Sequence, residues 1–169
     1  MEKLSANPSL RMAIEQYFAG ERSEMFAILA TCVALLLAAF ILLRAGDLFS
    51  RGLAIPFLVI IAIFGGLAVS LLVRDAKHSA DLISRVEQDP GSVLREESPR
   101  IEKVISLYPT YRYVYLASIV AALILFLFLR RPFWQGVAVG LLFLASIGYI
   151  IDHYSEQRAT NYYSQLQSR

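Results

Sequence analysis

Four long apolar runs alternate with polar segments along the chain. The runs cover residues 25 to 43, 53 to 73, 113 to 129 and 133 to 151, and none contains Asp, Glu, Lys, Arg or His. A bilayer span needs roughly 20 mostly apolar residues, within a range of about 17 to 25. Because lipid offers the backbone no hydrogen-bonding partner, each run is predicted to be a transmembrane helix. The pattern predicts an all-α integral membrane four-helix bundle of two hairpins, with residues 1–169 as a single transmembrane domain.

Two polar segments carry an apolar face at helical spacing. In residues 8 to 18 and 98 to 108, apolar side chains recur every three or four positions behind a proline. We expect two short interfacial amphipathic helices there, lying on the membrane surface or packing against another protein segment. Their apolar side chains form a candidate partner-docking face of Leu10, Ile14, Tyr17, Ile101, Val104, Ile105 and Tyr108.

The second and fourth runs are followed by polar sequence that keeps a helical character. Residues 74 to 88 alternate in charge sign, which predicts that the second helix continues into water until Asp89-Pro90-Gly91 stops it. Residues 92 to 97 are expected to be a polar connector. Residues 155 to 167 predict a helical C-terminal tail in the same compartment as the middle polar segment.

A ten-residue phrase occurs twice, at residues 49 to 58 and 133 to 142. Four positions are identical (Phe, Gly, Ala and Leu), and three more exchange one apolar residue for another. The match favours a tandem repeat with units at 7–89 and 98–169. In such a repeat the copies would be parallel, related by an axis along the membrane normal. Chance similarity between apolar helices is the alternative, since such helices share a small alphabet.

Composition supports a membrane protein and excludes several classes. The chain is 57% hydrophobic and 18% charged, too apolar for an ordinary soluble domain of this size. Its first 24 residues are polar, unlike a cleaved secretory signal, so the first apolar run is expected to be retained. The single cysteine, Cys32, cannot form an intrachain disulfide. A net charge of +2 without a basic stripe gives no reason to expect a nucleic-acid partner.

The distribution of basic residues predicts the orientation. The side that holds both termini carries 12 Lys or Arg, and the two hairpin turns carry four. By the positive-inside rule both termini are cytoplasmic, and we expect a bacterial inner membrane. The opposite orientation stays open, because the short hairpins are dense in Arg for their length.

The spans show no pattern that carries chemistry. Membrane enzymes and ion relays place ionisable groups inside the bilayer, and here every such group lies outside the runs or at their edges. His78 and His153 each follow a span and have acids nearby, but a metal site needs about three or four converging ligands. We therefore expect no catalytic site, metal or cofactor. An enzyme built on the two histidines is the least favoured hypothesis.

Small residues recur at every fourth position within the spans. Such spacing lets helix backbones approach closely and is a common association device in lipid. These residues either pack the chain's own bundle or form a surface for a homo-oligomer or a membrane-protein partner. The candidates are Ala30, Ala34 and Ala38, then Gly66 and Ser70, then Ala117 and Ala121, and finally Gly136 and Gly140.

Together these features favour a non-enzymatic multi-pass membrane protein that acts by protein–protein contact, as an accessory, anchoring or protective subunit of a membrane assembly. The alternative is a small oligomeric channel or transporter. Its expected signs are a polar stripe or a helix broken at mid-depth, and the second span, with Pro56, Gly65, Gly66 and Ser70, is the candidate.

Overall fold

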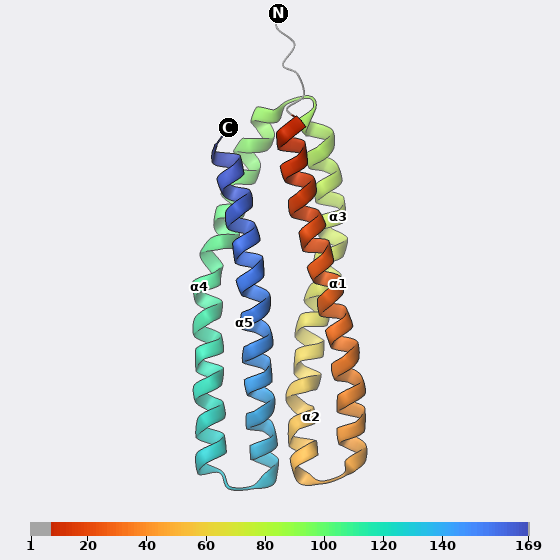
Figure 1. Ribbon diagram of the computed structural model, residues 1–169, viewed down its shortest axis with the longest axis vertical. Coiled ribbons are helices and arrows are strands. Elements are labelled where there is room, and N and C mark those ends of the chain that lie inside the picture. Colours follow the sequence, from red (N-terminus) through yellow and green to blue (C-terminus); the bar gives the residue numbers. More distant parts are fainter. Residues whose placement is uncertain (1–7, 169) are drawn as a thin grey trace, which may run out of the picture.

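The computed structural model describes residues 8–168, which form four helical rods packed side by side (Figure 1). The rods are α1 (Pro8–Ala45), the continuous sequence of α2 (Leu48–Ile60), η1 (Ile61–Gly65) and α3 (Gly66–Val86), α4 (Pro90–Phe128) and α5 (Pro132–Gln167). Each rod is long and apolar enough to cross a membrane. The predicted all-α bundle with four candidate spans is confirmed at this level, which points to an integral membrane protein.

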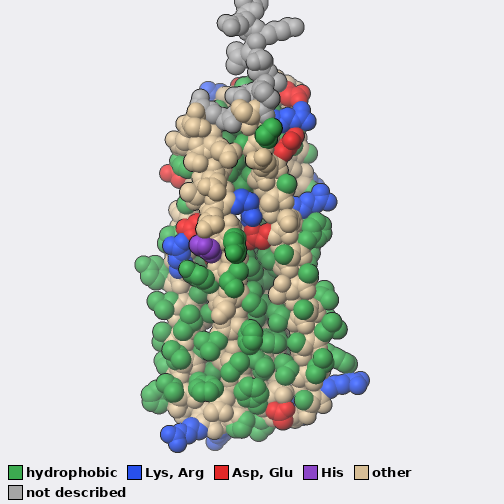
Figure 2. All heavy atoms as spheres, viewed as in Figure 1, with side chains coloured by type: hydrophobic (Ala, Val, Ile, Leu, Met, Phe, Trp, Pro, Cys, Tyr) green, Lys and Arg blue, Asp and Glu red, His purple; other side chains and the backbone are tan. Residues whose placement is uncertain are grey.

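The rods have an apolar lower part and a polar upper part. Figure 2 shows hydrophobic side chains covering the lower part of one face, and charged side chains above them and at the lower end. Both hairpin turns lie at the lower end and both termini at the upper end (Figure 1). The helices continue above the spans, so the chain carries an upper bundle in which all four rods take part.

The upper bundle has a core of its own. Leu10, Ile14, Leu82 and Ile101 are fully buried there, and they belong to a cluster drawn from α1, α3, α4 and α5. Burial of each large apolar side chain stabilises the fold by roughly 1.5–3 kcal/mol. This part of the chain is therefore a packed helical bundle and not a set of separate surface segments.

The two predicted interfacial helices are not separate elements, which corrects the expectation from the sequence. Residues 8 to 18 are the start of α1, which passes Gly20 without ending. A Cβ at Gly20 would lie 2.7 Å from Cδ of Arg158, so this glycine makes room for α5. Residues 92 to 108 belong to α4, whose interior holds Pro99 and Pro109.

The expected connector at residues 92 to 97 is helical as well, because Asp89 and Pro90 start α4 immediately after the turn. The Asp89 side chain accepts a hydrogen bond from the Ser92 N–H at 3.0 Å, and Pro90 occupies the first turn of α4. The predicted stop at Asp89-Pro90-Gly91 is confirmed. The C-terminal tail is also helical, as predicted, and continues α5 to Gln167. Asn7, the first residue of the predicted repeat, lies outside the described residues.

Helices α2 and α5 run parallel and make the closest contact in the lower part. A Cβ at Gly52 would collide with the backbone carbonyl oxygen of Phe133, and one at Gly136 with that of Phe49. These four residues are equivalent positions of the doubled phrase, so each copy makes the same contact with the other. Such reciprocity is expected of parallel repeats about an axis along the membrane normal. Duplication itself stays a prediction.

The outer helices α1 and α4 flank this central pair. In the most apolar stretch of each rod, 17% of the α1 residues and 6% of the α4 residues are buried, compared with 28% in each of the other two rods. Most of the span surface of α1 and α4 therefore faces outward, toward lipid or a partner. Within the second rod, Pro56 does not break the helix, and the π-helical turn Ile61–Gly65 follows it.

Candidate functional site

Ionisable side chains from all four rods meet inside the upper bundle, just above the spans. We call this set the charged layer. It comprises Glu21 and Glu24 of α1, Asp75 and His78 of α3, Glu97 and Arg100 of α4, and Arg158 of α5. Burying a charge is costly unless it is paired and hydrogen-bonded, so the pairing of this layer decides what it can do.

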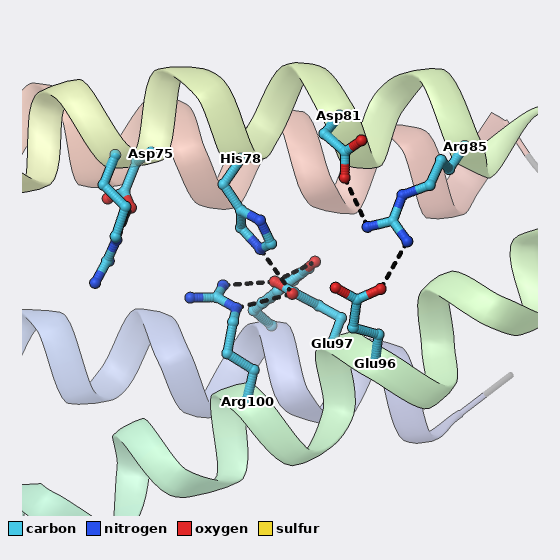
Figure 3. Close-up of polar contacts among 9 residues, drawn as sticks. Asp75, His78, Asp81, Arg85, Glu96, Glu97 and Arg100 are labelled. Atoms are coloured by element: carbon cyan, nitrogen blue, oxygen red, sulfur yellow. Dashed lines mark hydrogen bonds and ion pairs between the residues drawn. The ribbon is translucent and has the colours of Figure 1, made fainter.

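Glu97 is the most buried charge, with no exposed surface. Arg100 donates two hydrogen bonds to it, to Oε2 at 2.8 Å and to Oε1 at 2.5 Å, and His78 Nε2 lies 3.2 Å from Oε2 (Figure 3). The Tyr162 hydroxyl donates to Glu97 Oε1 at 3.4 Å. Burial acts to lower the pKa of Arg100, but its hydrogen bonds to Glu97 and the charge of Glu97 outweigh burial and raise this pKa, so Arg100 stays charged. This carboxylate ties α3, α4 and α5 together.

Arg158 is the counterpart on the other side of the layer. It contacts Glu24 directly and lies 3.5 Å from Glu21. The Ser155 hydroxyl donates to Glu24 Oε1 at 2.6 Å, which completes the partners of that carboxylate. Glu24 is thus the main ion-pair partner of Arg158, and this ion pair holds α5 to α1.

Asp75 is partnered on one side only. Its Oδ1 accepts a hydrogen bond from Arg74 Nε at 2.8 Å, whereas Oδ2 is buried and receives none within the described residues. The Glu21 carboxyl lies within hydrogen-bonding reach. Burial raises the pKa of Glu21, Arg158 lowers it, and the charge and hydrogen bond of Asp75 raise it again, for a net rise. Two carboxyl groups therefore meet where α1 and α3 face each other.

A groove of about 760 Å³ lies between α1 and α3 at this level, and Asp75 is part of its wall. Its volume is within the range of roughly 300–1,000 Å³ that is usual for ligand pockets. Met25 and Leu72 line it at the ends of their spans, and Arg22 and Ser79 line it above them. The groove therefore connects Asp75 with the boundary between the apolar and polar parts of the bundle.

A further pair of polar contacts joins α4 and α5 at the same boundary. The Tyr115 hydroxyl donates to Asp152 Oδ2 at 2.9 Å, and Arg112 pairs with Glu156. Gly148 leaves space for the Tyr115 ring. These contacts fix the second hairpin where its spans leave the apolar part.

The predicted docking face is mostly inside the chain, which corrects the expectation that it is open to a partner. Leu10, Ile14 and Ile101 have no exposed surface, and Tyr17 and Tyr108 are buried. The remaining two, Val104 and Ile105, are half-buried against the same core. The apolar faces were located correctly, but the surface they pack against belongs to this chain.

The predicted small-residue pairs divide into two groups. Gly136 and Gly140 are buried against α2, and Ala38 is half-buried in the core of the first hairpin. The other six are exposed on the span surface: Ala30, Ala34, Gly66, Ser70, Ala117 and Ala121. Apart from the adjacent backbone of its own helix, no described atom would lie within 4 Å of a Cβ at Gly66. Only one of the four sets therefore packs fully within the chain.

The two histidines have different surroundings. His78 lies against Glu97, whereas His153 is exposed, stacks on Tyr149 and lies 3.1 Å from Gln157. Among residues 8–168 no group of three or more His, Cys, Asp or Glu side chains is arranged to hold a metal ion. The structure gives the two histidines no shared site.

Comparison of the chain with protein-family models, with curated proteins and with solved structures finds no match. The proposals below are therefore drawn from the geometry and the sequence of this chain.

Proposed function

We propose that this chain is a non-enzymatic multi-pass membrane protein that acts by contact, as an accessory, anchoring or protective subunit of a membrane assembly. Its partner is the transmembrane helix of a second copy or of another membrane protein, in a bacterial inner membrane with both termini cytoplasmic. The observation that carries the proposal is the exposure of Ala30, Ala34, Gly66, Ser70, Ala117 and Ala121 on the span surface.

Small residues on a span surface favour contact with another transmembrane helix. Lipid tails are as apolar as Leu, so close backbone approach and packing drive association, and small residues permit both. Inside the chain, Gly136 and Gly140 serve this purpose at the α2–α5 contact. The exposed pairs have the same spacing, and the described residues leave them exposed on the span surface.

Two of the exposed pairs lie at nearly the same depth. Cys32 falls between Ala30 and Ala34 in α1, and its Sγ would lie 3.6 Å from a Cβ at Gly65, the neighbour of Gly66. A helix that approaches the first hairpin at this depth would find small residues on both rods. The charged layer supports the same function, because most of its charges are paired within the chain and hold the upper bundle rigid.

Co-purification from gently solubilised membranes tests the proposal. Differently tagged copies are co-expressed, and the retained proteins are identified by mass spectrometry. We expect the wild type to retain a second copy or a defined membrane protein, and Gly66→Leu to lose it. Val69→Leu is the matched control, since Val69 is also exposed on α3. Identical retained proteins for all three forms would contradict the proposal.

The alternative, a small oligomeric channel or transporter, is favoured by one feature. The π-helical turn Ile61–Gly65 lies in mid-span beside Gly66, and π-turns are frequent at functional sites. Purified protein in liposomes would then conduct ions or pass a solute, and Gly66→Leu would abolish the flux. Flux that is absent at all protein densities would remove this alternative.

A further inference from the structure

Two carboxyl groups share a buried position between α1 and α3. The residue Asp75 is 7% exposed, and the Glu21 side chain is 13% exposed. Oδ2 of Asp75 is inaccessible to water and receives no hydrogen bond from any described residue. A buried carboxylate oxygen without a donor is unfavourable, so this oxygen needs a proton donor that an ionised Glu21 cannot supply.

The surrounding charges do not compensate two ionised carboxylates. From α5, Arg158 faces the pair, but its direct contact is with Glu24. From α3 itself, Arg74 reaches only Oδ1 of Asp75, and its side chain is 58% exposed. The Tyr17 hydroxyl of α1 lies within hydrogen-bonding reach of Glu21, and Tyr108 of α4 lies nearby, but neither brings a positive charge.

We propose that Glu21 and Asp75 form a single-proton site, in which a protonated Glu21 donates a hydrogen bond to Oδ2 of an ionised Asp75 at neutral pH. The ligand of this site is a proton. Like-charged carboxyl groups in contact share a proton because both cannot ionise at low cost. The inference does not depend on the proposed function, since it concerns the chain's own fold.

The groove between α1 and α3 supplies the route for proton exchange. Asp75 forms part of the wall of this groove. When the proton leaves, two negative charges oppose each other across the α1–α3 contact.

Infrared spectroscopy of the purified full chain in lipid nanodiscs tests the site. A protonated carboxyl group has a carbonyl band that a carboxylate lacks. Burial also raises the pKa of Asp152, so Asp152→Asn is used as the background for every sample. In that background we expect the band at neutral pH and its loss as the pH is raised.

Three variants decide which residues carry the band. Glu21→Gln should abolish it, because Asp75 can then ionise beside Arg74. Asp75→Asn should move its loss to lower pH, because Glu21 stays buried but no longer faces a second negative charge. Glu15→Gln should keep it, because Glu15 lies on the same helix but is exposed and pairs with Arg11, outside the charged layer. Absence of the band at neutral pH in the background protein, its survival in Glu21→Gln, or an unchanged pH of its loss in Asp75→Asn would overturn the proposal. If a variant does not fold, the background protein alone decides.

Discussion

The contact between α2 and α5 gives a sharp test of the packing in the spans. A Cβ at Gly136 would lie 2.8 Å from Leu53 N, and closer still to the Phe49 carbonyl oxygen. These are backbone atoms that cannot rotate away, so Gly136→Ala must push α2 and α5 apart by roughly 1 Å. Overpacking costs typically about 1–3 kcal/mol, and the better helix propensity of Ala returns up to about 1 kcal/mol. We expect a net loss of about 1–2 kcal/mol.

Gly52→Ala meets the same obstacle from the other copy, with Phe133 in place of Phe49. It should therefore cost about the same, and the double variant should cost less than the sum because one separation of the helices relieves both collisions. Reversible unfolding in mixed micelles, followed by circular dichroism, measures these losses. Gly66→Ala is the control, since nothing lies within 4 Å of its Cβ, and it should be neutral or slightly stabilising. Equal stability of the Gly136→Ala and Gly66→Ala proteins would refute the reasoning.

The remaining predictions concern the upper bundle and the orientation. Arg100→Met leaves the fully buried Glu97 without its main partner and should lower the free energy of unfolding by roughly 3–5 kcal/mol, whereas Met at the exposed Arg95 should change it by less than about 0.5 kcal/mol in the same assay. The pKa of Glu21 is raised above 4.5 in the folded chain, so the folded state binds the Glu21 proton more tightly than the unfolded state does. The free energy of unfolding should therefore fall as the pH rises from about 4.5 through the raised pKa. The Glu21→Gln protein should not show this pH-dependent fall in stability. A C-terminal reporter that is active only in the cytoplasm should be active, and one active only in the periplasm should be silent.

The spans and the turn between α3 and α4 could be predicted from the sequence because each depends on local chemistry. Long apolar runs without charge leave no alternative to a helix in lipid. The Asp89 side chain caps the N-terminus of α4, and Pro90 occupies its first turn, so the start of α4 depends only on neighbouring residues. Gly20 and Pro109 lie inside helices, although both residue types usually mark helix ends. Here Gly20 makes room for Arg158, and Pro109 is carried inside α4.

The charged layer could not be predicted, although its spacing is visible in the sequence. Glu21 and Glu24, Asp75 and His78, and Glu97 and Arg100 are each three residues apart. Such pairs are also typical of a solvated helix face. Only the packing of the four rods turns them inward. The expectation that the docking face is open to a partner was wrong for a related reason. An apolar stripe has the same periodicity whether it packs on its own chain or on a partner.

Site-specific photo-crosslinking from Gly66 in intact membranes tests the central claim most directly. A photoreactive amino acid at this exposed mid-span position reaches only what lies against the span surface. A discrete adduct is expected, either at twice the mass of the chain or at the mass of the chain plus a defined membrane protein. Val69 is the comparison position on the same helix. If Gly66 gives only lipid adducts, the exposed small residues are not a contact surface and the proposed function is wrong.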